Sequence, residues 1–176
     1  MDLLYEGHIT TTKLQKALLA VTSGIACMLY PQRPDFIALF GETTGHRALK
    51  RLFVKMRSDP EGAAVLANRP RIRSSTIDFG YLRQLPSHTF GSHYVAFLDR
   101  YGYSPNDRGL VNFVDDPDLA YVMQRYREVH DLVHVLLGQQ TDMLGEVVVK
   151  WVEGLQLGLP LGLLGGFFGA LRLKPK

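Results

Sequence analysis

HDLVH, residues 130–134, lies near the end of a segment with a strong helical pattern. Asp116 and the proline after it are typical of a helix start, an apolar stripe follows, and Gly138 ends the pattern. A second helical pattern begins after Thr141 or Asp142. Because only a few residues separate the two patterns, they predict an antiparallel helical hairpin.

Side chains of the metal-ligand type gather at this predicted hairpin. Successive residues of an α-helix are about 100° apart, so His130, Asp131 and His134 project from one sector of the first helix. Glu146 and His134 lie equally far from the expected turn and should therefore face each other. Imidazole nitrogens and carboxylate oxygens are ligands of zinc and other divalent transition metals. We predict that these four residues bind Zn²⁺ or another divalent metal.

Other interpretations of the same residues stay open. The two histidines could be core side chains hydrogen-bonded to backbone, and Glu146 could pair with Lys150 one helical turn later. A His-Asp doublet also occurs in metal-dependent phosphohydrolases, which would need His46 and Asp115 as further ligands. The zinc-protease pattern has Glu directly after the first His, where this chain has Asp131, so peptide hydrolysis is not expected.

Helical patterns also dominate the rest of the chain, and no sustained apolar–polar alternation indicates a sheet. One such helix should start at the threonines 10–12 and end before Pro31. The chain has 46% apolar and 21% charged residues, which is typical of a globular protein. A net charge of +3 is too weak to indicate nucleic-acid binding, and the single Cys27 excludes an internal disulfide. We expect residues 1–176 to form a single domain, a mostly α-helical bundle.

The C-terminal part of the chain is apolar and rich in glycine. No charged residue occurs from Gly154 to Leu171, a length of about 18 residues that is the lower limit for crossing a bilayer. One proline and several glycines argue against a straight spanning helix. The segment is either tightly packed core or a lipid-contacting element, flanked by Arg172, Lys174 and Lys176 at the level of the lipid headgroups.

Several stretches beyond the histidines carry a family resemblance. They are RYREV at 125–129, MLGEVVVKW at 143–151, GLP at 158–160, GFFG at 166–169 and GETTGH at 41–46. Together with His130, Asp131, His134 and Glu146, they resemble the coenzyme Q biosynthesis protein 4 family. The resemblance extends over residues 4–173.

The resemblance implies a protein of ubiquinone biosynthesis, peripheral on the matrix side of the mitochondrial inner membrane. It implies metal-dependent oxidative decarboxylation (C1 hydroxylation) of a polyprenylated hydroxybenzoate, with zinc as the usual ion. His130, Asp131, His134 and Glu146 would then be both metal ligands and catalytic residues. The implied partners are the polyprenylated quinone precursor, other enzymes of the pathway and the membrane surface, and a homo-oligomer is a further expectation. The alternative is a non-catalytic, lipid-binding organiser of the enzyme complex with a structural zinc.

Both ends of the chain bear on this expectation. Family members usually continue past the GFFG stretch into a further C-terminal segment, which we expect this chain to lack. The start, Met1 and Asp2 with Glu6 nearby, does not resemble an Arg-rich, acid-poor transit peptide. The expected mitochondrial location therefore rests on the resemblance alone.

Overall fold

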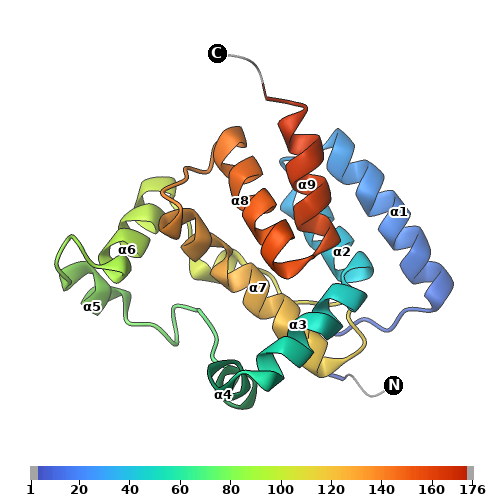
Figure 1. The fold of residues 1–176 in the computed structure, drawn as a ribbon, viewed down its shortest axis with the longest axis horizontal. Helices are drawn as coiled ribbons and strands as arrows, with labels where there is room; N and C mark the ends of the chain where they lie inside the picture. Colours follow the sequence, from blue (N-terminus) through green and yellow to red (C-terminus); the bar gives the residue numbers. More distant parts are fainter. Residues whose placement is uncertain (1–3, 174–176) are drawn as a thin grey trace.

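The computed structural model describes residues 4–173, and every regular element in them is helical (Figure 1). The elements are α1 (Lys13–Leu29), α2 (Pro34–Thr44), α3 (His46–Ser58), α4 (Pro60–Asn68), α5 (Phe79–Gln84), α6 (Phe90–Tyr101), the 3-10 turn η1 (Pro105–Asp107), α7 (Pro117–Leu136), α8 (Met143–Leu157) and α9 (Pro160–Ala170). The predicted mostly α fold is confirmed. No helix in the described part of the chain is long and apolar enough to span a bilayer.

Helix α7 crosses the middle of the molecule, in contact with α3, α6 and α8 (Figure 1). One cluster of buried apolar side chains surrounds its first half and comprises Ala48, Leu49, Val111, Val114, Leu119, Ala120, Val122, Met123, Tyr126, Leu159 and Leu161. A second cluster, made of Ile72, Tyr94, Phe97 and Leu98, packs against its second half. Because both clusters pack against α7, they fix the helix and its buried side chains in place.

The ends of the hairpin helices follow local sequence signals. Asp116 caps α7 and accepts hydrogen bonds from the backbone N–H groups of Asp118 and Leu119, at 2.9 and 3.1 Å. Gly138 follows the helix with φ of 62°, a conformation that costs glycine little. Asp142 caps α8 through the backbone N–H of Gly145, at 2.8 Å. Each such cap contributes about 1 kcal/mol. Gly138 and Asp142 thus mark the two ends of the turn between α7 and α8.

The glycine-rich segment forms the end of α8 and all of α9. Gly158 turns the chain with φ of 66°, and α9 folds back against α8 (Figure 1). The two helices meet at Gly154 and Gly162, where a Cβ atom added to Gly162 would lie 2.8 Å from the Gly154 Cα. One face of α9 is therefore packed core, while its other face exposes side chains such as Phe167. Of the basic residues expected to flank the segment, Lys174 and Lys176 lie outside the described residues.

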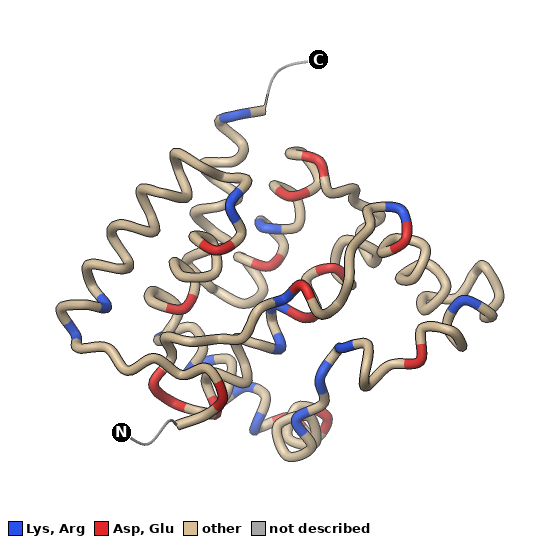
Figure 2. The backbone as a smooth tube through the Cα atoms, turned by 180° about the vertical axis from the view of Figure 1, so that it is seen from behind, with Lys and Arg blue, Asp and Glu red and all other residues tan. Residues whose placement is uncertain are grey.

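Helix α1 begins at the expected Thr12 cap, but its large apolar side chains point outward. Leu14, Leu18, Val21 and Ile25 are each more than half exposed. Small residues lie on its inner side instead: Ser23 is buried, and a Cβ atom added to Gly24 would lie 3.2 Å from the ring of Phe40 in α2. Figure 2 shows that α1 carries charge only near its N-terminal end. The helix thus presents a continuous apolar surface to its surroundings.

Candidate metal centre

His130 and His134 stand one turn apart on α7 with their rings edge to face, and the ring centroids are 4.9 Å apart. Glu146 of α8 faces both of them; for His134, this is the predicted arrangement. Its carboxylate oxygens lie 3.5 Å from Nε2 of His130 and 3.3 Å from Nε2 of His134. One ligand atom from each of the three residues lies within 4.8 Å of the other two. This arrangement fits a single divalent ion between them.

The Nε2 atom of His134 indicates what the site is built to bind. The side chain is fully buried, and among the described residues this nitrogen has no hydrogen-bond partner of acceptable geometry, although the Glu146 oxygen is near. Buried polar atoms are normally satisfied, and a bound water or ion is a common reason for an exception. A shared cation would satisfy His134, His130 and Glu146 together, so the residues present fit a metal ion.

The electrostatics of Glu146 suit a ligand. Burial by itself would raise the pKa of this carboxyl, but the neighbouring His130 and His134 rings, with Lys150, lower its pKa far below the ordinary value. Glu146 therefore stays anionic at neutral pH. Its side chain is 39% exposed, whereas both histidines are buried. Three protein ligands with one side toward solvent are typical of a catalytic rather than a closed structural zinc site.

Asp131, the fourth predicted ligand, lies outside this group of three. Its buried carboxylate accepts a hydrogen bond from the Arg108 guanidinium, which comes from the loop between α6 and α7. One residue along a helix turns the side chain by about 100°, and here that rotation points Asp131 away from Glu146. The structure thus brings together His130, His134 and Glu146, and it ties Asp131 to a loop.

Glu153 is a residue of the site that the sequence interpretation missed. It is only 2% exposed, and its Oε1 atom lies 2.8 Å from Nδ1 of His130. Burial raises the pKa of Glu153, but the contact with His130 and the charge of Lys150 outweigh that effect and lower it. The available signal was spacing, because Glu153 follows Glu146 by two helical turns and so shares its face of α8.

The residues of the alternative interpretations lie elsewhere. Within the described chain, Lys150 forms its ion pair with Glu153, at 3.7 Å, and none with Glu146. His46 is exposed at the start of α3. Asp115 instead pairs with Lys16 near the N-terminal end of α1. The ligand set of a His-Asp phosphohydrolase is therefore not assembled among residues 4–173.

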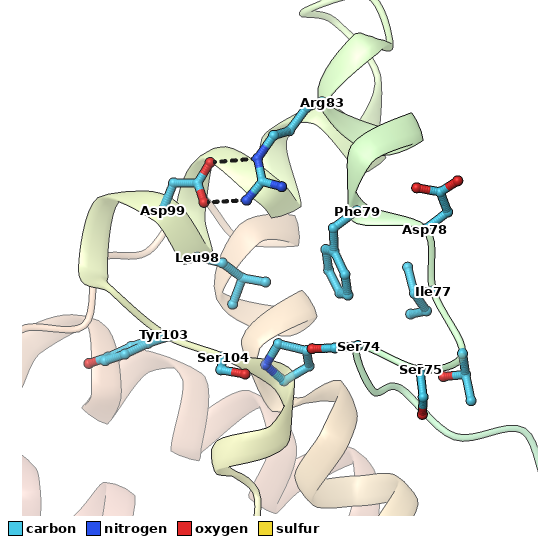
Figure 3. A pocket seen from close by; sticks show the side chains of 12 residues that line it. Ser74, Ser75, Ile77, Asp78, Phe79, Arg83, Leu98, Asp99, Tyr103 and Ser104 are labelled. Atoms are coloured by element: carbon cyan, nitrogen blue, oxygen red, sulfur yellow. Dashed lines mark hydrogen bonds and ion pairs between the residues drawn. The ribbon is translucent and has the colours of Figure 1, made fainter.

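A separate hollow of about 770 Å³ lies between the loop before α5 and the end of α6 (Figure 3). At its rim, Arg83 donates two hydrogen bonds to Asp99, at 3.1 and 2.7 Å. Hydroxyl groups such as that of Ser74 lie beside the apolar side chains of Phe79 and Leu98 in its lining. The histidine cluster does not contribute to this lining, so the hollow is distinct from the candidate metal centre.

Comparisons with known proteins agree with the sequence resemblance. Residues 5–176 match the family model described as coenzyme Q (ubiquinone) biosynthesis protein Coq4. The human ubiquinone biosynthesis protein COQ4 homolog, mitochondrial, is 54% identical over 170 residues, which cover 97% of this chain and 64% of that protein. The Danio rerio protein of the same name is 54% identical over 171 residues, covering 97% and 63%. The chain thus spans less than two thirds of these curated relatives.

A solved structure supports the fold. The crystal structure of a protein from Nostoc punctiforme PCC 73102, with a proposed role in ubiquinone biosynthesis, superposes with a TM-score of 0.65 at 18% identity. The match covers 87% of this chain and 71% of that chain. At this level of identity, the likeness shows a common fold and nothing about chemistry.

Proposed function

Because this chain belongs to the coenzyme Q (ubiquinone) biosynthesis protein Coq4 family, we propose that it acts in ubiquinone biosynthesis in the mitochondrion. The names of the human and Danio rerio relatives give both the pathway, ubiquinone biosynthesis, and the location, the mitochondrion. The similarity to them extends over nearly all of this chain. We further propose a peripheral position on the matrix side of the inner membrane. The exposed apolar side chains of α1 and α9 support that placement.

The proposed reaction is metal-dependent oxidative decarboxylation (C1 hydroxylation) of a polyprenylated hydroxybenzoate. The observation that carries it is the convergence of His130, His134 and Glu146 within 4.8 Å, with a buried imidazole nitrogen that makes no hydrogen bond of acceptable geometry to any described residue. When bound, a divalent ion such as zinc would supply Lewis-acid stabilisation of negative charge on the ring carboxylate and phenolic oxygens. An oxidative step also requires an electron acceptor, either molecular oxygen or a redox partner.

The chain's own residues would hold and shield this chemistry. His130 and His134 close the buried side of the site, where they exclude water. The half-exposed Glu146 marks the side from which a ring would enter. The same helix exposes Leu144 and Leu155 to solvent. An isoprenoid tail could therefore lie along α8 while its head group reaches the cluster.

The alternative function is a non-catalytic organiser that binds lipid and other pathway enzymes, with zinc holding the hairpin. The large exposed apolar surface of α1, α8 and α9 favours this alternative. A structural zinc, however, usually has four protein ligands, and the described residues bring three together. The two functions are separated by whether one coordination position exchanges with water.

The first experiment is element-specific metal analysis of the protein purified without added metal, together with Glu146→Gln and the control Glu61→Gln. Glu61 lies on α4, outside the ligand group. Near-stoichiometric divalent metal in the wild type and in Glu61→Gln, and its loss in Glu146→Gln, is the expected result. The decarboxylation of a prenylated hydroxybenzoate should fall with the metal. A folded wild-type protein that takes up no ion would refute the metal-enzyme proposal. Loss of stability and assembly together in Glu146→Gln would favour the organiser.

A further inference from the structure

The two ring nitrogens of His130 have different surroundings. Nε2 points toward Glu146, at 3.5 Å, on the side where the ligand atoms converge. Nδ1 lies 2.8 Å from an oxygen of Glu153, on the opposite side of the ring. An ionised carboxylate can only accept a hydrogen bond, so Nδ1 must be the protonated nitrogen in this contact. In the neutral imidazole, Nε2 is then unprotonated and free to bind a cation.

Glu153 is itself held rigidly. It is 2% exposed, and its second oxygen accepts a hydrogen bond from the Tyr126 hydroxyl, at 3.1 Å. Lys150 lies 3.7 Å from the same oxygen and supplies a positive charge. A buried carboxylate that contacts an imidazole, a phenol and an ammonium group has little freedom to rotate. Its direction toward His130 is therefore built into the packing of α7 against α8.

His134 has no equivalent support within residues 4–173. Its Nδ1 is 3.4 Å from the backbone carbonyl of Gln139, a long contact, and its ring is otherwise held by burial beside Phe97. The carboxylate support is thus specific to His130. Asp131 follows His130 in sequence but cannot take the place of Glu153, because its carboxylate is paired with Arg108.

We propose that Glu153 is the positioning residue of the metal centre: it fixes the tautomer and the orientation of His130 that present Nε2 to the ion. The proposal rests on the metal site proposed above. A carboxylate behind a metal-binding histidine also makes the ring a stronger ligand, and its loss in other metalloproteins weakens metal binding about 10- to 100-fold. We expect a loss in that range for Glu153→Gln, whose amide has nearly the same shape but no charge.

The test compares Glu153→Gln with Glu128→Gln. Glu128 is a matched control, because it is an equally buried glutamate of the same helical core that pairs with Arg71, away from the site. Zinc dissociation constants are measured on folded protein by competition with a chromophoric chelator. The expected result is a 10- to 100-fold increase for Glu153→Gln and a change below about threefold for Glu128→Gln. Equal losses in the two variants would mean that Glu153 is merely structural.

A second readout does not depend on metal binding. Nitrogen-15 NMR of the metal-free wild type at mildly alkaline pH should show His130 protonated at Nδ1, and Glu153→Gln should populate the Nε2–H tautomer. A wild-type His130 protonated at Nε2 overturns the proposal, even if Glu153→Gln does not fold. If His130 has the expected tautomer but the protein binds no zinc, the metal-enzyme proposal fails, while Glu153 remains the group that orients His130.

Discussion

Replacement of Gly154 by alanine tests whether α8 and α9 pack through their backbones. An added Cβ would lie 2.7 Å from the backbone nitrogen of Leu163 and 2.8 Å from the carbonyl carbon of Gly162. Optimal contacts between such atoms are about 3.5–4.0 Å, so the helices would have to separate by roughly 1 Å. Backbone atoms cannot rotate away, which places the overpacking penalty near the upper end of its range, at about 3 kcal/mol. Alanine recovers about 1 kcal/mol of helix propensity, leaving a net loss of about 2 kcal/mol.

Gly165→Ala is the matched control on the same helix pair. There an added Cβ would lie 3.6 Å from side-chain carbons of Lys150, an ordinary contact, so the substitution should stabilise the protein by up to about 1 kcal/mol. Urea unfolding followed by the fluorescence of Trp151, the only tryptophan, gives both free energies of unfolding. The two variants should differ by about 3 kcal/mol. Equal stability of Gly154→Ala and Gly165→Ala would refute the close-contact argument.

Three further predictions concern charge and ligand. Glu42→Gln should lower the free energy of unfolding by about 3–5 kcal/mol, because it breaks a buried ion pair with Arg127. Denaturant unfolding measures this loss, and a loss below about 1 kcal/mol would contradict a stabilising role of the ion pair. Burial raises the pKa of Tyr5 to about 12, and its hydroxyl donates a hydrogen bond to the backbone carbonyl of Val114, at 2.6 Å. Since the folded pKa lies above the ordinary value near 10, the stability contributed by the neutral phenol is present below pH 10 and lost through about pH 12. Alkaline titration followed by absorbance should show, in Tyr5→Phe, one tyrosine fewer that ionises near pH 12 than in the wild type. Identical curves for the two proteins would contradict the raised pKa of Tyr5. Zinc at 100 times its dissociation constant should stabilise the wild type by about 2.7 kcal/mol in thermal melts, and Glu146→Gln should show no such shift.

The sequence predicts the hairpin well because its signals are local. Asp116 and Asp142 each cap the helix that directly follows them, and Gly138 needs only its own positive φ. The facing of His134 and Glu146 follows from the short turn. These features depend on neighbours along the chain, so the local sequence is sufficient to predict them.

The errors and omissions arise where distant segments meet. Asp131 lies beside His130 in sequence, but Arg108 approaches from a loop and pairs with it. Glu153 shares a face of α8 with Glu146, but its contact with the His130 ring depends on how α8 packs against α7. In α1, the apolar stripe predicts a helix correctly but not which face is inward, because the small residues permit the closer approach to α2.

The three residues of the candidate metal centre, with Glu153 and Tyr126 behind His130, come from one stretch of chain, and this has a kinetic consequence. Closing the short turn before Asp142 costs little entropy, whereas docking α1–α4 requires contacts across long separations. The hairpin should therefore form early in folding, and an ion captured at that stage would favour the native pairing before the rest of the chain arrives. Pulse-labelled hydrogen exchange during refolding should show amides of α7 and α8 protected first, and earlier still with zinc present.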